Sequence, residues 1–406
     1  MNIAGIRKRF TKDRSLAVSL SLLGLLLLGN HAGAQTATDT TCNAATSKGT
    51  SGDQANWQSV CWIDFSKLSG PAVTGFDPTP SPSLLTAGQN FRVKLTDGST
   101  LSFNVKPAAT NATTWVAATA PSWEGAAIGS AASYTGIPGR PILRYQRESA
   151  PTNGLVFSNI AMTDPKGNPV TNFRFLAADG ESTDASSSTL KESWKVTTNG
   201  AAWTVFDKVA NTAGLNPNAT SATFTTSTSV IGPHVAGTDT TTITETGVSS
   251  NNAGSYIYST VAPTTVNFSA AAPEPGMQGI MIGVQVAVLN LQKDVKSRVF
   301  PSDQFTYSIQ NSASGAVTSN TTSGSTPGMA PMVSTTQVGA PVAHTFSEIG
   351  ANSNTVLNNY NSTYSCSNVI SSTTALPSGT GTSFSLTPAP GDVITCTLTN
   401  TARPQL

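Results

Sequence analysis

Charged side chains are scarce in this sequence. Asp, Glu, Lys and Arg make up 11% of its 406 residues, whereas ordinary soluble domains carry about 25%. The net charge is +1 at pH 7, so no basic surface for nucleic acid is predicted. Histidine occurs only three times, and residues 1–406 contain no GxSxG, HExxH or P-loop motif. These absences argue against a serine hydrolase, a zinc protease or a nucleotide-binding protein, and we expect no enzymatic activity.

Long apolar runs are missing except near the amino terminus. There, basic residues precede the apolar run Leu16–Leu28, and Ala32-Gly33-Ala34 fits a signal-peptidase site. Residues 1–34 are therefore predicted to be a signal peptide of the Sec type, because Lys8 separates the arginines that twin-arginine export requires side by side. Removing this segment takes away five basic residues and one acidic residue, which leaves a net charge of −3. We expect a secreted or cell-surface protein without a transmembrane segment.

Serine, threonine and asparagine supply the polarity that charged residues do not, and they are interleaved with Val, Ile, Leu and Phe. Short alternating segments of this kind, bounded by turn residues, predict an all-β fold. About 370 residues remain after the signal peptide, which is enough for two domains. We predict a flexible lead-in at residues 35–56, a first β-sandwich at 57–291 and a smaller one at 292–403.

Three pairs of alternating segments in the first domain are predicted to form β-hairpins. They join residues 91–95 to 101–105 through Asp97-Gly98, 155–162 to 170–178 through Asp164–Asn168, and 194–196 to 203–205 through Asn199-Gly200. Asn-Gly and Asp-Gly favour tight hairpin turns because these residues tolerate positive φ angles. The apolar segment Gly279–Leu291 is too short to span a bilayer, and we interpret it as a buried strand that closes this domain.

All four cysteines follow the signal peptide, one pair near each end of the remaining chain. Exported proteins mature in an oxidising compartment, so we predict the disulfides Cys42–Cys61 and Cys366–Cys396. The loops that they close have about 20 and 30 residues, for which the chain-entropy model gives roughly 3 to 4 kcal/mol each. No CxxC motif or Cys/His spacing typical of a metal site occurs.

Four motifs of the first domain occur in the order, and at about the spacing, seen in CshA-type fibrillar adhesins. They are CWIDF at Cys61–Phe65, APSWEG at Ala120–Gly125, YTGIPG at Tyr134–Gly139 and FLAADGES at Phe175–Ser182. Residues 43–291 resemble the second non-repetitive domain of this family. The resemblance implies a lectin-like β-sandwich that takes part in binding host extracellular-matrix protein at the cell surface.

An irregular segment rich in Gly and Pro is the candidate ligand-binding region. Its candidate residues are Trp123, Tyr134, Arg140, Arg144 and Tyr145. Two alternatives remain open. Trp123 and Tyr134 could instead fill the core of the sandwich, as large aromatic residues usually do. The aromatic rings could also stack on sugars, which would make the domain a lectin that binds a surface glycan.

Acidic residues near the FLAADGES motif suggest two further possibilities. Asp179, Glu181 and Asp184 could bind Ca²⁺ through carboxylate oxygens, although the spacing is not that of an EF-hand and a solvated loop explains it as well. Glu124 and Glu181 would suit a glycoside hydrolase only if their carboxyl groups lay within about 10 Å of each other. We expect no other cofactor.

The second domain resembles the SpaA-like or CnaB-like prealbumin-fold modules of bacterial surface proteins, which are Ig-like β-sandwiches. Alternating segments at residues 305–309, 344–349 and 395–400 carry this resemblance. It implies a spontaneous isopeptide bond between a lysine and an asparagine, assisted by an acidic residue. Residues 402–406 contain neither an LPxTG-type sorting motif nor an apolar anchor, so the sequence does not predict how the protein is attached to a cell.

Side-chain alternation identifies candidates for such a bond. Lys293 shares a strand face with Leu289 and Leu291, and Asn400 shares one with Leu398. Glu348 lies on the same face as Phe346, so all three polar side chains could meet in the core. The alternative has Lys293 extending to solvent, Glu348 exposed and Asn400 in a turn.

Overall fold

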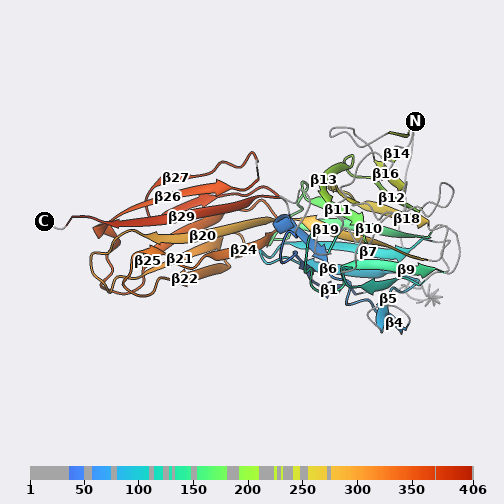
Figure 1. Cartoon of the computed structure of the whole chain (residues 1–406), viewed down its shortest axis with the longest axis horizontal. Coiled ribbons are helices and arrows are strands. Elements are labelled where there is room, and N and C mark those ends of the chain that lie inside the picture. Colours follow the sequence, from blue (N-terminus) through green and yellow to red (C-terminus); the bar gives the residue numbers. More distant parts are fainter. Residues whose placement is uncertain are drawn as a thin grey trace, which may run out of the picture. The chain divides into compact units, whose positions relative to one another are not determined.

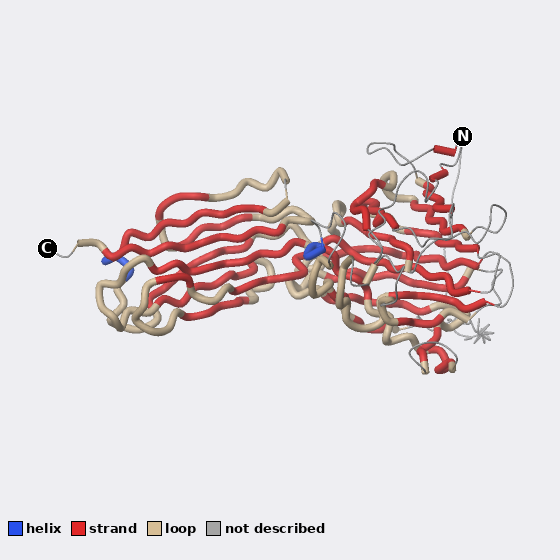
Figure 2. Tube along the Cα trace, viewed as in Figure 1, coloured by secondary structure: helices blue, strands red, loops and turns tan. Residues whose placement is uncertain are grey.

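The protein is built from strands (Figure 2). The computed structural model describes residues 36–49, 57–74, 80–108, 114–121, 128–129, 133–147, 153–180, 192–209, 224–225, 230–231, 241–246, 255–271, 276–370 and 372–404. Within them the helices are two short 3-10 turns, η1 (Trp57–Ser59) and η2 (Leu357–Asn359). The prediction of an all-β fold is confirmed. The predicted signal peptide lies outside the described residues, and no described helix is long and apolar enough to cross a membrane.

The first domain contains a sheet of seven strands (Figure 1). Their order is β1 (Thr38–Thr40), β6 (Gln89–Lys94), β7 (Thr100–Pro107), β10 (Asn153–Thr163), β18 (Thr265–Ala271), β12 (Ser193–Thr198) and β16 (Thr242–Thr246). Phe91 and Val93 of β6 are buried whereas Arg92 and Lys94 are exposed. This alternation gives the sheet one inward-facing apolar side.

A second sheet of ten strands faces the first. Eight follow the order β13 (Thr204–Val209), β17 (Ser255–Val261), β11 (Arg174–Asp179), β19 (Gly276–Gln285), β9 (Ile142–Arg147), β8 (Val116–Ala118), β5 (Ser81–Ser83) and β4 (Gly70–Val73). The other two are β2 (Cys42–Asn43) and β3 (Val60–Ile63), which pair with each other, and β3 also pairs with β19. A separate pair joins β14 (Phe224–Thr225) to β15 (Val230–Ile231).

The core lies between these two sheets. Phe157 of the seven-stranded sheet and Phe175 of the ten-stranded sheet meet there, with ring centroids 6.4 Å apart. A smaller apolar cluster covers the opposite face of the ten-stranded sheet and includes Trp62, Tyr134 and Ile257. Several strands of this sheet are therefore buried on both faces. That explains why β3 and β11 are continuously apolar in sequence and do not alternate.

The first predicted hairpin is confirmed. Strands β6 and β7 pair with Phe91 opposite Phe103 and Val93 opposite Leu101. Gly98 adopts a φ of +91° in the turn between them, a conformation that costs glycine little because it has no Cβ atom.

The other two predicted hairpins are wrong. Strands β10 and β12 lie in the seven-stranded sheet, whereas β11 and β13, which follow them, lie in the ten-stranded sheet. A turn does form after β10, where Asp164 Oδ1 accepts hydrogen bonds from the backbone N–H groups of Lys166 and Asn168. Gly200 does not take a positive φ; its backbone instead approaches Val261 so closely that a Cβ atom would lie 2.6 Å from the Val261 carbonyl oxygen. Each of these turns carries the chain from one sheet to the sheet that packs against it. Such a turn needs the same residues as a hairpin turn.

The second domain is a smaller sandwich. Its six-stranded sheet holds β23 (Gly328–Met329), β20 (Ala287–Val295), β29 (Val393–Ala402), β26 (Tyr360–Asn368) and β27 (Ser378–Thr380) in this order, with β24 (Val333–Val338) also paired to β20. Its four-stranded sheet has the order β22 (Val317–Thr321), β21 (Phe305–Asn311), β25 (His344–Gly350) and β28 (Ser383–Leu386). Apolar side chains of both sheets form one core cluster.

Two predictions about the organisation of the chain differ from the structure. The apolar segment Gly279–Leu291 is not one strand, because β19 ends at Gln285 in the first domain and β20 begins at Ala287 in the second. The second domain therefore begins before Leu291. The predicted lead-in is not flexible throughout, since β1 and β2 pair with the two sheets of the first domain.

Candidate functional site

Three polar side chains meet inside the second domain. Lys293 lies on β20 and Asn400 on β29, two strands that pair in parallel with Lys293 opposite Leu398. Glu348 lies on β25 of the facing four-stranded sheet. The apolar neighbours Leu291 and Leu398 are completely buried, so the strand alternation that buries them also turns the lysine and the asparagine inward.

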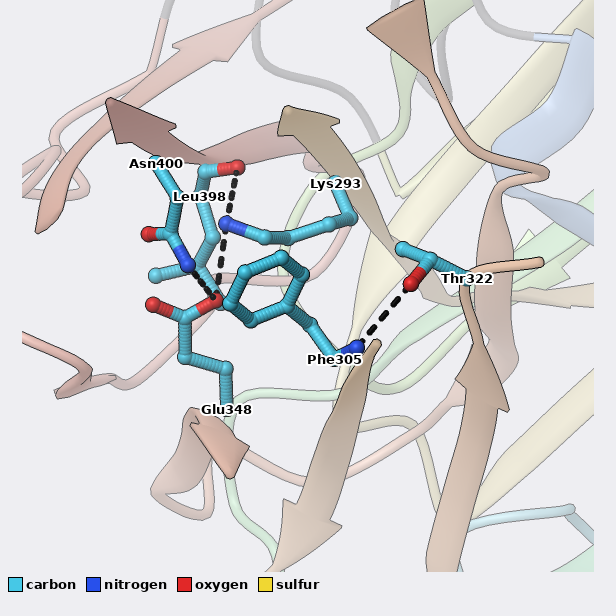
Figure 3. A network of polar contacts seen from close by, with 6 residues as sticks. All are labelled: Lys293, Phe305, Thr322, Glu348, Leu398 and Asn400. Atoms are coloured by element: carbon cyan, nitrogen blue, oxygen red, sulfur yellow. Dashed lines mark hydrogen bonds and ion pairs between the residues drawn. The ribbon is translucent and has the colours of Figure 1, made fainter. Parts of the chain in front are cut away.

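One carboxylate oxygen connects the three groups (Figure 3). Glu348 Oε2 lies 2.7 Å from Lys293 Nζ and accepts a hydrogen bond from Asn400 Nδ2 at 3.2 Å. Lys293 Nζ also donates to the carbonyl oxygen of Leu398 at 3.2 Å. Glu348 Oε1 and Asn400 Oδ1 are buried without a hydrogen-bond partner. The same oxygen atom thus touches both the amine and the amide nitrogen.

The site is dry. Lys293 and Asn400 are 0% exposed and Glu348 is 3% exposed. The ring of Phe305 covers the lysine, with its centroid 5.1 Å from Nζ. Burial is the main cause that lowers the pKa of Lys293, and the Glu348 carboxylate opposes it. A lowered pKa favours the neutral amine, which is the nucleophilic form.

Both predicted disulfides are confirmed, and one lies in the same sheet as this site. Cys366 and Cys396 are direct partners on β26 and β29 and are joined by a disulfide. Cys42 and Cys61 are likewise joined in the first domain. The Cys42–Cys61 bridge ties the short strand β2 to β3.

The predicted ligand residues are distributed over different parts of the first domain. Tyr134 is buried in the cluster on the outer face of the ten-stranded sheet, where its hydroxyl donates to Asp207 Oδ2 at 2.7 Å. Tyr145 is buried in the core between the sheets, and its hydroxyl donates to the carbonyl oxygen of Ala270 at 3.1 Å. Neither ring is accessible for stacking on a ligand.

The two arginines of this group are half-buried. The Arg140 guanidinium lies within 3.4 to 3.5 Å of the carbonyl oxygens of Pro80 and Ala117. Trp123 lies outside the described residues. The structure therefore does not gather the four described candidates on one surface.

The predicted metal site is described only in part. Asp179 is the last residue of β11 and is completely buried, while Glu181, Asp184 and Glu124 lie outside the described residues. Among the described residues, no group of three or more His, Cys, Asp or Glu side chains could hold a metal ion. Sequence analysis missed Glu245, a buried acid on β16. The only feature of the sequence that indicated burial of Glu245 was its position two residues after Ile243, which places both side chains on the same strand face.

Two protein-family models match the chain. Residues 58–286, more than half of the 406 residues, match the model described as surface adhesin CshA non-repetitive domain 2. Residues 288–402 match a prealbumin-like fold domain of the SpaA type. A search of curated proteins found no match.

Several solved structures are similar at low identity. An N-terminal adhesin domain, Sgo0707 of Streptococcus gordonii, is 8% identical with a TM-score of 0.30, over 87% of this chain and 97% of that one. An adhesin of Mobiluncus mulieris is 11% identical with a TM-score of 0.23, over 65% and 92%. The major pilin of Streptococcus pyogenes is 10% identical with a TM-score of 0.21, over 57% and 99%. At these scores the likeness says nothing of function.

The match to the first model is the stronger result because of its extent. It includes the confirmed disulfide partner Cys61 and nearly all described strands of both sheets in the first domain. The second model begins at Val288, within one residue of the start of β20. The chain belongs to the CshA non-repetitive domain 2 family of surface adhesins, and a prealbumin-like domain follows in the same chain.

Proposed function

We propose that this chain is an exported surface adhesin that acts by binding and not by catalysis. Its first domain binds a host extracellular-matrix protein, and its second domain supports the first. The observation that carries this proposal is the match of residues 58–286 to a family of surface adhesins. A surface glycan is the alternative ligand. The burial of Tyr134 and Tyr145 favours a protein ligand, because buried rings cannot form a sugar-stacking platform.

Binding to matrix proteins tests this function. The chain without residues 1–34 should bind at least one member of a panel of immobilised matrix proteins, and a glycan array should remain unlabelled. Replacing Arg140 and Arg144 together by alanine should weaken binding about tenfold, which corresponds to about 1.4 kcal/mol, if these half-buried cations contact the ligand. Lys296→Ala, in the second domain, is the matched control. Labelling of the array with no matrix binding would support a lectin instead.

The second part of the proposal is an isopeptide bond between Lys293 and Asn400. The neutral amine of Lys293 attacks Cγ of Asn400, forming a C–N bond. Glu348 Oε2, which touches both nitrogens, takes the proton from Nζ and delivers it to Nδ2. The bond from Cγ to Nδ2 breaks and ammonia leaves. The fold holds the acid, the amine and the amide in contact, so the reaction is effectively intramolecular. It can therefore proceed much faster than the same reaction between free groups in water.

Intact mass tests the bond. The purified chain should be lighter than its sequence mass by about 17 Da for ammonia, in addition to about 4 Da for the two disulfides. Reduction should restore the disulfide hydrogens and leave the 17 Da loss unchanged. Protease digestion should then yield a branched peptide that contains both Lys293 and Asn400. A mass lowered by the disulfides alone would show that the bond does not form.

A further inference from the structure

The outer face of the seven-stranded sheet is a broad polar surface of the first domain. On the ten-stranded sheet, the outer face is covered by the apolar cluster that includes Trp62 and Tyr134. On the seven-stranded sheet, the side chains that alternate with core residues point away from the core. Along β6, β7, β12 and β18 these outward positions are half-buried or exposed, and most of them hold Ser, Thr or Asn.

The charged side chains of this outer face are mainly basic. Lys106 on β7 and Lys195 on β12 are exposed, and neither takes part in a described ion pair. Arg92 and Lys94 on β6 are also exposed, and both contact the carboxylate of Asp39, at 2.6 and 3.5 Å. Asp39 is the single acidic residue at a described outward position of this sheet. Four cations and one anion give the face a net charge of +3.

The net charge of the sequence conceals this basic face. Without residues 1–34 the chain carries a net charge of −3, but many of its acidic residues are buried, among them Asp97 and Asp207 in the first domain. A buried carboxylate does not contact a ligand at the surface. The charge that a partner meets on this sheet is therefore opposite in sign to the charge of the chain.

Strand register places the two unpaired lysines on a diagonal across the sheet. Lys106 lies opposite Val156, and Val156 lies opposite Asn267. Asn267 lies opposite Thr197, which is two residues from Lys195. With about 4.8 Å between strands and about 3.4 Å per residue, the Cα atoms of the two lysines are about 16 Å apart. This is the length of about five residues of extended chain, so one short segment can contact both ammonium groups.

The other side chains of this face favour an acidic protein segment over other polyanions. No Phe, Tyr or Trp occupies a described outward position of the seven strands, so the face offers no platform on which nucleobases or sugar rings stack. The hydroxyl and amide groups between the lysines can donate to and accept from the backbone of an extended peptide. A sulfated glycosaminoglycan is the alternative that the experiment separates.

We propose that the outer face of the seven-stranded sheet binds an acidic, extended segment of the adhesin's protein ligand through Lys106 and Lys195, with Arg92 and Lys94 at its edge. This inference rests on the proposed function and adds the charge of the ligand to it. Complementary charge accelerates association and excludes partners of the wrong charge. Salt screens such exposed charges over about 8 Å at physiological ionic strength, so binding should weaken as salt is added.

Immobilised poly-L-glutamate tests the face, with heparin and poly-L-lysine as comparison surfaces. The chain without residues 1–34 should bind poly-L-glutamate at about 20 mM NaCl and lose at least about tenfold in affinity at about 300 mM. It should not bind poly-L-lysine. Absence of salt-dependent binding to poly-L-glutamate would overturn the proposal. Binding to heparin without binding to poly-L-glutamate would also overturn it and assign the face to a sulfated glycosaminoglycan.

Variants of opposite effect separate this face from general attraction. Lys106→Gln combined with Lys195→Gln should weaken binding about tenfold at low salt and leave the melting temperature unchanged, because both side chains are exposed. Asp39→Asn should strengthen binding about threefold, because it frees the two cations that Asp39 contacts. Lys48→Gln combined with Lys296→Gln is the matched control. It removes two exposed positive charges elsewhere and should bind like the parent.

The control also sets the outcome that contradicts the inference. Equal binding by the parent and by Lys106→Gln with Lys195→Gln, or an equal loss in the control, would overturn it. The panel of matrix proteins distinguishes this failure from failure of the proposed function. If the parent and the double variant bound a matrix protein equally, the chain would be an adhesin that does not use this face. If the parent bound no matrix protein, the proposed function would fail, and this inference with it.

Discussion

Glu348→Gln is expected to leave Lys293 and Asn400 unjoined and to lower the melting temperature of the second domain by about 15 to 20 °C. Glutamine can neither take the proton from the amine nor deliver it to the leaving nitrogen. The bond between positions 293 and 400 closes a loop of roughly 100 residues, for which the chain-entropy model of cross-links gives about 4.7 kcal/mol. In a domain of this size, 1 kcal/mol shifts the melting temperature by about 4 °C.

Intact mass and calorimetry measure the two effects in the same sample. The variant should lack the 17 Da loss of the parent, about one ammonia, and its second-domain transition should move to lower temperature. All six tryptophans lie between residues 57 and 203, so tryptophan fluorescence reports only the first domain. That signal should not move, which makes the first domain an internal reference for the second.

Matched variants show whether the effect belongs to the cross-link. Asn400→Ala removes the group that is attacked and should reproduce both results. Lys296→Ala breaks an ion pair between an exposed lysine and the mostly buried Asp294, outside the Lys293–Asn400 contact, and should keep the full mass loss. If Glu348→Gln retained the mass loss, Glu348 would not be the proton carrier. If it lost the bond without a change in melting temperature, the bond would not stabilise the domain.

Side-chain alternation predicted more of the second domain than of the first. Lys293, Glu348 and Asn400 each lie on strands with a regular alternation of apolar residues, so their inward direction could be inferred from the strands alone. Only the resemblance to prealbumin-fold modules indicated that the three strands are neighbours. Alternation fixes which face a side chain occupies but not which strands meet, because that depends on contacts distant in sequence.

The first domain shows why local signals were insufficient. The turns after β10 and β12 have the residues of hairpins, yet both carry the chain from one sheet to the other. A strand that packs against a facing sheet has the same apolar alternation as a strand in a hairpin, so the sequence does not distinguish the two. Glu245 was missed for a related reason, since a glutamate between threonines normally lies on an exposed face.

The first domain is expected to lose stability as the pH rises from about 5 to about 8. Glu245 has a pKa near 4.5 when unfolded and about 8 in the folded chain. Between these values the folded state binds a proton that the unfolded state has released, so raising the pH favours unfolding. The difference corresponds to at most about 5 kcal/mol at 1.36 kcal/mol per pH unit. Below the lower pKa the stabilisation is fully present, and above the upper one it is lost.

Urea unfolding followed by tryptophan fluorescence between pH 5 and pH 9, in EDTA, measures this dependence in the first domain, which contains all six tryptophans. Burial and Glu245 raise the pKa of Tyr256 to about 12, and the pKa of Tyr258 is also raised, so neither tyrosine titrates in this range. Histidine is not a competing cause among the described residues of the first domain, because His344 lies in the second. Glu245→Gln, which cannot ionise, should remove most of the slope and be the more stable protein at pH 8. If the stability of the parent chain were constant or rose between pH 6 and pH 8, Glu245 would be ionised in the folded state. A cation or a hydrogen-bond donor other than the Tyr258 hydroxyl and the Tyr256 backbone would then lie beside its carboxylate.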